Sequence, residues 1–305
     1  MSGLDTAQAP PRAAGAGRLW RAYAGSGLAV AAAAILLLIV LTAAMAPWVA
    51  PQNPYDLASL DLLDGRLPPF SRGEAGTLYL LGTDDQARDM LSAILYGLRT
   101  SLLVGLAATT AAALIGTPLG LLAAWKGGRV DSLVMRMVDL QLSLPAILVA
   151  LALLAALGRG VDKIILALTL VQWAVFARTA RASALVERQR DYVAAARCLD
   201  IPAHRVLFGH VLPNALPPIS VIAAVEVAHA IGLEATLSFL GVGLPISRPS
   251  LGLLISNGFQ YLMNGQYWIS IFPGVALLVL VFAINLAADR LRDVLDPHGS
   301  HTAQR

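Results

Sequence analysis

An acidic and an imidazole side chain lie inside one long apolar stretch of the sequence. Glu226 and His229 are three residues apart, so on a helix they share one face, where a Glu-x-x-His pair can supply two ligands to a metal ion. Two ligands are too few for a selective metal site, and a hydrogen bond between the two side chains inside a helix bundle explains the pair as well. Metal binding and helix packing are therefore both open, and neither an HExxH nor a GxSxG motif is present to suggest hydrolysis.

The composition indicates what kind of fold must position this pair. Of the 305 residues 57% are hydrophobic and 13% are charged, and the mean hydropathy is +0.68, whereas soluble proteins carry roughly a quarter charged residues. No segment alternates with a strand-like period of two, so helices rather than barrel strands are expected to cross the membrane. The sequence predicts an all-α, polytopic membrane helix bundle with six transmembrane helices, at 27–48, 100–124, 138–157, 163–180, 215–240 and 270–288.

The basic residues predict the orientation of these spans. On one side of the predicted membrane lie 15 of the 22 Lys and Arg residues. They are in the tail 1–26, the turn after the second span, the inner loop 181–214 with the end of the span before it, and the tail 289–305. The external segment 49–99 and the two shorter loops on its side hold the other 7. By the positive-inside rule both termini are expected to be cytoplasmic, and 100–288 forms a five-helix core. The single cysteine, Cys198, has no partner in the chain for a disulfide.

The inner loop is polar and basic, yet its pattern favours helices. Three successive alanines, Ala194, Ala195 and Ala196, give a first helix a smooth surface that another surface can approach closely. Asp200 and Pro202 predict a break and a new start, and a second short helix is expected to stop near Pro213. This helix-turn-helix could lie on lipid headgroups or could dock on a partner.

The same loop carries a family resemblance. The segment DYVAAARCLDIPAHRVLFGHVLPNALPP resembles the EAA signature of ABC importer permeases, with the alanine pair at Ala195 and Ala196 and the Leu-Pro at Leu212 and Pro213. Two positions depart from the signature, because Ala194 replaces its Glu and Asp200 replaces its Gly. Asp200 must therefore adopt a left-handed conformation or cap the second helix.

Further motifs resemble one branch of that family, the dipeptide, oligopeptide and nickel permeases. They occur in the family's order over about 80–298, and they are LGTDDQARDM with Ala87 in place of a Gly, GGRVDSLVMRMVDLQLSLPAI, LSFLGVGLP, FPG and NLAADRLRDVLDP. The resemblance implies the type I importer permease fold in a bacterial inner membrane. It also implies a substrate that is a di- or oligopeptide or a related small solute, with a nickel or metal complex as the alternative. A self-contained secondary transporter is disfavoured, because no inverted repeat is evident.

The resemblance also implies partners. A second homologous permease would complete a heterodimer, two cytoplasmic ABC ATPases would hydrolyse ATP with Mg²⁺, and an external binding protein would deliver the substrate. The chain itself has no GxxxxGK[ST] loop, so it is not expected to be an enzyme or to hold a cofactor. The residues expected at the ATPase contact are Tyr192, Ala194, Ala195, Ala196, Arg197, Asp200, Leu212 and Pro213. Glu226 and His229 replace small apolar residues of the family pattern, which adds a third hypothesis for them, that they line the translocation path.

Small and charged residues elsewhere in the spans have structural interpretations. Gly116 and Gly120 form a GxxxG around Pro118, which predicts close packing against the partner permease or a neighbouring span, or alternatively a hinge. The charged residues near predicted span ends are assigned structural roles; they are Asp139, Glu234 and Asp289.

Overall fold

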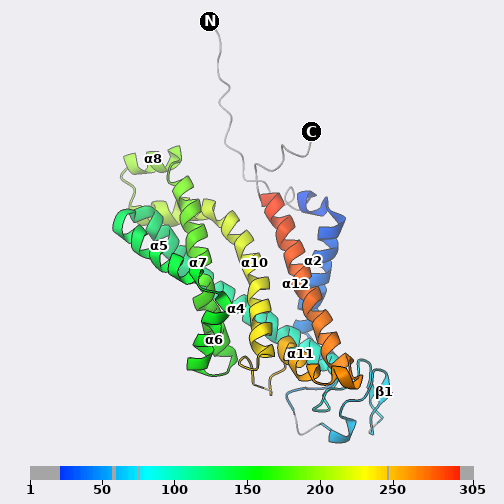
Figure 1. The fold of residues 1–305 in the computed structure, drawn as a ribbon. Coiled ribbons are helices and arrows are strands. Elements are labelled where there is room, and N and C mark those ends of the chain that lie inside the picture. The colour runs from blue at the N-terminus through cyan, green and yellow to red at the C-terminus, as the bar shows by residue number, and fades with distance from the viewer. Residues whose placement is uncertain (1–20, 57–59, 75, 246, 296–305) are drawn as a thin grey trace.

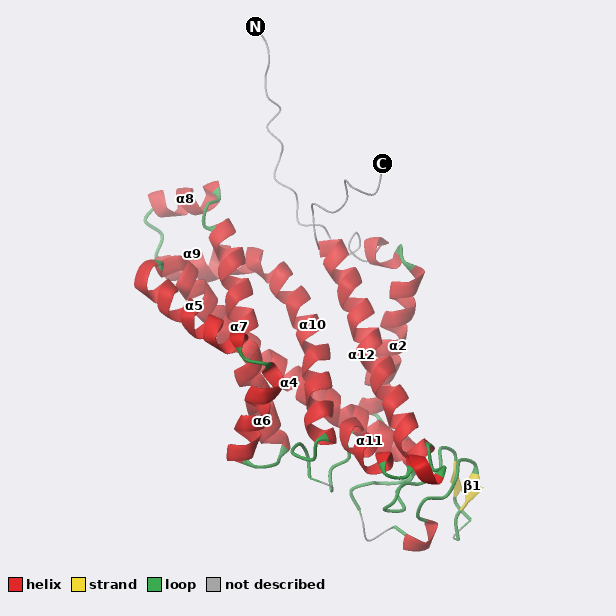
Figure 2. Cartoon of the chain, viewed as in Figure 1, coloured by secondary structure: helices red, strands yellow, loops and turns green. Residues whose placement is uncertain are grey.

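The chain folds into a bundle of long helices with a small irregular unit at one end (Figures 1 and 2). The computed structural model describes residues 21–56, 60–74, 76–245 and 247–295. Within these described residues, five helices are long and apolar enough to span a membrane, or six if one bent pair counts as a span. The five are α2 (Gly27–Ala44), α4 (Met90–Lys126), α7 (Val161–Glu187), α10 (Leu212–Phe239) and α12 (Trp268–Leu295). The predicted all-α membrane bundle is therefore confirmed.

The bent pair corrects the prediction of one continuous third span at 138–157. Helix α5 (Gly128–Ser143) and helix α6 (Ala146–Leu157) meet at an angle of 92°. The break lies at Leu144, whose backbone is extended (φ −93°, ψ 139°), because the ring of the following Pro145 disfavours the helical conformation in the residue before it. Two ion pairs hold α5 along α7, Arg181 with Asp131 at 2.6 Å and Arg178 with Asp139 at 2.7 Å.

Helix α4 begins earlier than the sequence pattern suggests. It starts at Met90 rather than near residue 100, because the Asp89 carboxylate caps it by accepting a hydrogen bond from the Ser92 amide at 2.8 Å. Residues 90–99 therefore belong to the bundle and not to the external segment. With 37 residues the helix is about 55 Å long, far more than the roughly 30 Å of hydrocarbon, and it crosses behind α10 at a slant (Figure 1).

Other helix boundaries also differ from those predicted from the sequence. Helix α7 extends to Glu187 and α10 begins at Leu212, so both ends of the predicted inner loop 181–214 are helical. Helix α12 continues to Leu295, past the predicted start of the tail at 289. The short elements are α3 (Ala46–Val49), η2 (Leu62–Asp64), β1 (Ser71–Arg72), β2 (Leu78–Tyr79), α8 (Asp191–Cys198), α9 (Ala203–Val206), η3 (Leu207–Val211), α11 (Leu251–Phe259) and η4 (Leu262–Asn264).

The two glycines of the GxxxG lie against the backbone of α7. A Cβ at Gly116 would collide with the carbonyl oxygen of Trp173, and one at Gly120 with that of Ala177. The predicted packing against a neighbouring span is therefore confirmed, and α7 is that span. Such close approach brings the two helices into extended contact over the core residues Leu121, Phe176 and Ala180.

Helix ends show which elements share a side of the bundle. The start of α2, the end of α12 and helix α8 all lie at the upper end in Figure 1, whereas β1 and the surrounding loops lie at the opposite end. The helix ends that adjoin the predicted tails thus lie on the same side as the inner loop, and residues 1–20 and 296–305 of those tails lie outside the described residues. In the lower unit, β1 pairs antiparallel with β2, with Ser71 opposite Tyr79.

A buried polar network stabilises this lower unit, which comprises the described residues between 50 and 89. Arg88 and Asp84 are 0% and 1% exposed, and the Arg88 Nε donates to the Asp84 carboxylate at 2.6 Å. The Tyr79 hydroxyl donates to Asp64 at 2.9 Å, and burial together with this bond raises the pKa of Tyr79 to about 12. The Trp268 indole donates to the Thr83 carbonyl at 3.1 Å, which ties the unit to α12.

Arg88→Leu is expected to destabilise this unit by about 3–5 kcal/mol, because it leaves the Asp84 carboxylate buried without its counter-ion. The measurement is the rate of chymotrypsin cleavage within residues 50–89 of the membrane-embedded chain. Arg72→Leu is the control, since Arg72 is exposed and its loss should change stability by less than about 0.5 kcal/mol. Equal cleavage rates for the two variants would show that the Arg88 pair does not stabilise the unit.

Candidate functional site

The loop between α7 and α10 projects beyond the ends of the spans (Figure 1). Helix α8 ends in a Schellman motif, in which the Ile201 amide donates to the Ala196 carbonyl at 3.1 Å and the Asp200 amide to the Arg197 carbonyl at 3.0 Å. Asp200 is left-handed, with φ 54°, and Pro202 rather than Asp200 occupies the cap position of α9. Of the two predicted roles for Asp200, the left-handed turn is therefore the one confirmed.

The second helix of the loop does not stop near Pro213, which corrects the sequence prediction. Helix α9 passes through the π-helical turn η3 directly into α10. Pro213 has no backbone N–H to donate to the preceding turn, yet the helix continues past it. The loop is therefore continuous with a span, so a displacement of α9 would be passed directly to α10.

The inward face of the loop is packed into the bundle. Val193, Ala196 and Val206 are at most 6% exposed and contact a core formed by α4, α7 and α10. The Arg197 guanidinium lies 4.7 Å from the centroid of the Trp125 ring, a cation–π contact with the end of α4. Through these contacts a displacement of α8 can be passed to the ends of the neighbouring spans.

Tyr192 bridges the ends of two spans. Its hydroxyl donates to the Glu187 carboxylate at 2.6 Å, and it accepts from the Asn214 amide at 3.3 Å. Burial and the bond to Glu187 raise the pKa of Tyr192 to about 12, from a usual value of about 10. The stability linked to this protonated hydroxyl is complete below about pH 10 and is lost only as the pH rises toward 12, so Tyr192 remains a donor at physiological pH.

Tyr192→Phe is expected to loosen α8, because it removes a hydrogen bond to a charged acceptor worth about 1.5–3 kcal/mol. Hydrogen exchange should show faster exchange of the amides of α8, with those of α12 unchanged. If α8 keeps its protection in the variant, the apolar packing of Val193 and Ala196 alone holds the helix, and the bridge contributes nothing measurable.

The outward face of the loop separates the predicted contact residues into two groups. Ala194, Ala195, Arg197, Asp200 and Pro213 are exposed, whereas Ala196 is buried and Tyr192 and Leu212 are partly buried. Two exposed apolar residues of the loop were not predicted. They are Leu199, which is 75% exposed, and Phe208, which is 53% exposed. Their apolar character within an otherwise polar loop was the available signal.

A cavity of about 240 Å³ with four polar side chains in its lining lies between α10, α7 and the α5–α6 break. Glu226 and His229 line it near the middle of α10, together with Gln141 and Gln172. The Gln172 amide donates to the Glu226 backbone carbonyl at 2.8 Å, and its oxygen accepts from Thr109 at 3.4 Å. Its other lining residues are apolar, namely Leu142, Leu144, Ala146, Val171, Val175 and Leu233.

The geometry of Glu226 and His229 changes their interpretation. The Glu226 Oε1 lies 3.9 Å from the His229 Nδ1, which is too long for a hydrogen bond, and the His229 side chain is 71% exposed. The predicted hydrogen bond between the two side chains is absent at this separation, but the two groups lie close enough for an ion pair when the imidazole is protonated. Among the described residues no group of three or more His, Cys, Asp and Glu side chains lies close enough to hold a metal ion. An imidazole exposed at mid-span must face a partner protein or water.

Of the three charged residues that were assigned structural roles, Glu234 and Asp139 make side-chain contacts, whereas Asp289 is exposed on α12. Glu234 is 0% exposed, and its carboxylate accepts from the hydroxyls of Ser101 at 2.8 Å and Ser238 at 2.7 Å. This ties α10 to α4, in agreement with the structural role assigned to Glu234. Asp139 pairs with Arg178, as described above.

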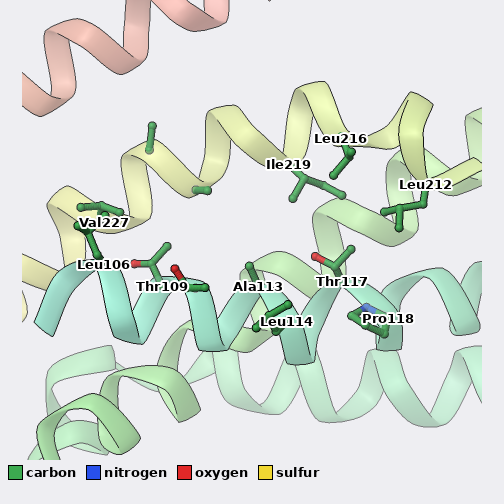
Figure 3. Close-up of a pocket in the computed structure, with 13 residues that line it drawn as sticks. Leu106, Thr109, Ala113, Leu114, Thr117, Pro118, Leu212, Leu216, Ile219 and Val227 are labelled. Atoms are coloured by element: carbon green, nitrogen blue, oxygen red, sulfur yellow. The ribbon is translucent and has the colours of Figure 1, made fainter. Parts of the chain in front are cut away.

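A separate groove of about 480 Å³ runs between α4 and α10. In Figure 3, Leu216 and Ile219 of α10 face Ala113, Leu114 and Thr117 of α4 across it. Threonine hydroxyls are the only polar side-chain groups among the residues that line this groove. It therefore offers no charge to a polar solute, unlike the cavity beside Glu226.

Comparisons with known proteins agree with this architecture. Residues 116–300 match the family described as the binding-protein-dependent transport system inner membrane component, and residues 17–69 match the N-terminal TM domain of oligopeptide transport permease C. The di/tripeptide transport system permease protein DppC of Pseudomonas aeruginosa is 38% identical over 279 residues, which are 91% of this chain and 90% of that protein. The dipeptide transport system permease protein DppC of Escherichia coli is 39% identical over 279 residues, which are 91% of each chain.

A solved structure shows the same fold. It is an inward-facing conformation of the MetNI methionine ABC transporter, with a TM-score of 0.55 at 21% identity, covering 68% of this chain and 98% of that chain. The family match and the structural match thus both agree with the bundle of apolar helices described above. The chain belongs to the family of binding-protein-dependent transport system inner membrane components.

Proposed function

We propose that this chain is one permease subunit of an ATP-driven importer that carries di- or oligopeptides across the cytoplasmic membrane. The relatives named above are permeases for dipeptides and tripeptides, which supports a peptide rather than a nickel complex as the substrate. The observation that carries the proposal is helix α8, which presents Ala194 and Ala195 outward while its other face is packed against three spans.

The outward face of α8 is the docking site for a cytoplasmic ATPase. Small side chains at Ala194 and Ala195 allow close approach, and the exposed Leu199 and Phe208 add apolar surface to the contact. ATP binding would close two ATPases and move α8, and the continuity of α9 with α10 would pass that movement to the spans. ATP and Mg²⁺ are held by the ATPases, a second permease completes the path, and an external binding protein delivers the peptide.

Orientation follows from the same proposal. The end of the bundle that carries α8 and most of the basic residues is cytoplasmic, and the unit around β1 is external. Glu226 and His229 then lie midway across the membrane on the translocation path, where an exposed imidazole is compatible with water.

Copurification and reconstitution test the proposal. The tagged chain should copurify with a P-loop ATPase and a second permease, and the complex in proteoliposomes should take up Ala-Ala only with ATP and the binding protein. A purified chain that transports the peptide alone would contradict the proposal, as would a complex that takes up nickel but no peptide.

A further inference from the structure

The cavity beside Glu226 carries one carboxylate and neither a Lys nor an Arg side chain, and its one imidazole, His229, is charged only when protonated. Its polar lining residues are Glu226, His229, Gln141 and Gln172. A carboxylate near the middle of a span lies where charges interact strongly and are costly without a partner. Such a cavity favours a solute that carries positive charge.

The hydrogen-bonding groups of the cavity are available for a cation. The Glu226 side chain is 10% exposed, and its separation of 3.9 Å from His229 leaves the carboxylate oxygens able to accept hydrogen bonds. Gln172 is held in place by its bonds to the Glu226 carbonyl and Thr109. The Gln141 side chain makes no hydrogen bond with any residue that the structure describes, so its amide oxygen is a second acceptor.

We propose that this cavity binds the protonated amino terminus of a peptide in transit, with the Glu226 carboxylate as its counter-ion. This inference rests on the proposed peptide importer. An ammonium group has three N–H donors, which Glu226, the Gln141 amide oxygen and a neutral His229 can accept. The volume of about 240 Å³ equals roughly eight water molecules, which suits one terminal residue rather than a whole oligopeptide. The exposed His229 marks the open side, toward which the rest of the peptide would extend.

A thiol placed in the cavity reports its occupancy. Val175 lines the cavity, and Cys198 is the only cysteine of the chain, so V175C in a C198S background gives this chain one thiol at the site. The alkylation rate of V175C by a small water-soluble maleimide is measured on the assembled complex without nucleotide. Millimolar Ala-Ala is compared with propionyl-alanine, which has the same skeleton without the ammonium group.

Ala-Ala is expected to slow the alkylation about tenfold and propionyl-alanine to leave it unchanged, since a charge-assisted hydrogen bond changes affinity by about tenfold or more. E226Q should abolish the protection and E226D should retain part of it. T236V is the matched control, because Thr236 is exposed on the same helix and its hydroxyl donates to the Gly232 carbonyl of that helix. In T236V, Ala-Ala should slow the alkylation of V175C as much as it does in the complex without this substitution.

Three outcomes would overturn the inference: equal protection by both compounds, protection that survives E226Q, or a V175C thiol that no peptide protects. Uptake of Ala-Ala by the unsubstituted complex is measured in parallel. Normal uptake with any of these outcomes removes only the ammonium site, whereas absence of peptide uptake removes the proposed function itself.

Discussion

Ala195→Glu is expected to lower ATP-driven peptide uptake at least about a hundredfold while the chain still folds and inserts. Ala195 is exposed on α8, so the substitution does not disturb the core. In the docked complex the glutamate would be buried without a counter-ion, which costs about 3–5 kcal/mol, more than a hundredfold in affinity. The measurements are uptake by proteoliposomes and the amount of ATPase that copurifies with the chain.

Two further substitutions separate docking from folding. Ala195→Ser keeps a small side chain at the same position and should retain uptake within about twofold, since exposed substitutions change stability by less than about 0.5 kcal/mol. Ala196→Glu should instead reduce the amount of folded chain, because Ala196 is 6% exposed and packs with Val193. If Ala195→Glu binds ATPase and transports like the unsubstituted chain, α8 is not the docking element and contact of this loop with lipid headgroups becomes the better explanation.

Apolar runs and charge placement were enough to predict the bundle, but not where helices bend or begin. Hydropathy measures how well a segment suits lipid, and the segment 138–157 is apolar enough to be read as one span. The 92° break at Leu144 therefore cannot be detected from hydropathy. The signal for the break is Pro145, whose effect is confined to the preceding residue and leaves the hydropathy of the segment unchanged. The start of α4 was missed for another reason: residues 90–98 are apolar too, but Arg99 separates them from the apolar run at 100–124, and the Asp89 cap and tertiary burial make the two stretches one helix.

The sequence predicted which residues belong to the candidate site, but not which of their side chains are exposed or which residues of other helices lie beside them. The sequence placed three alanines on one helix, yet only the fold decides that Ala194 and Ala195 face outward and Ala196 inward. Likewise, the i, i+3 spacing put Glu226 and His229 on one face, but their separation of 3.9 Å and the exposure of His229 depend on rotamers and on the α5–α6 break beside them. Gln141 and Gln172 complete that cavity from other helices, a long-range juxtaposition that spacing along one helix cannot reveal.

Gly120→Leu is expected to prevent α4 and α7 from packing and to remove most of the folded chain. A Cβ at this position would meet the carbonyl of Ala177 and would lie 2.9 Å from the Arg181 amide nitrogen. Backbone atoms of a helix cannot rotate away as a side chain can, so the helices themselves would have to separate. The measurement is the fraction of monodisperse chain after detergent extraction, followed by its thermal unfolding.

Gly120→Ala sharpens this test, because alanine is the better helix former by about 0.8–1 kcal/mol and on propensity alone would stabilise α4. Any loss of stability must then come from the contact with α7. Gly232→Ala is the matched control: Gly232 lies in α10, and a Cβ added there would meet no atom within 4 Å, so only the propensity gain should remain. Opposite signs for the two substitutions would establish that α4 and α7 require close contact. Equal stabilisation of both would mean that the two spans separate readily, as the alternative of a hinge at the GxxxG requires.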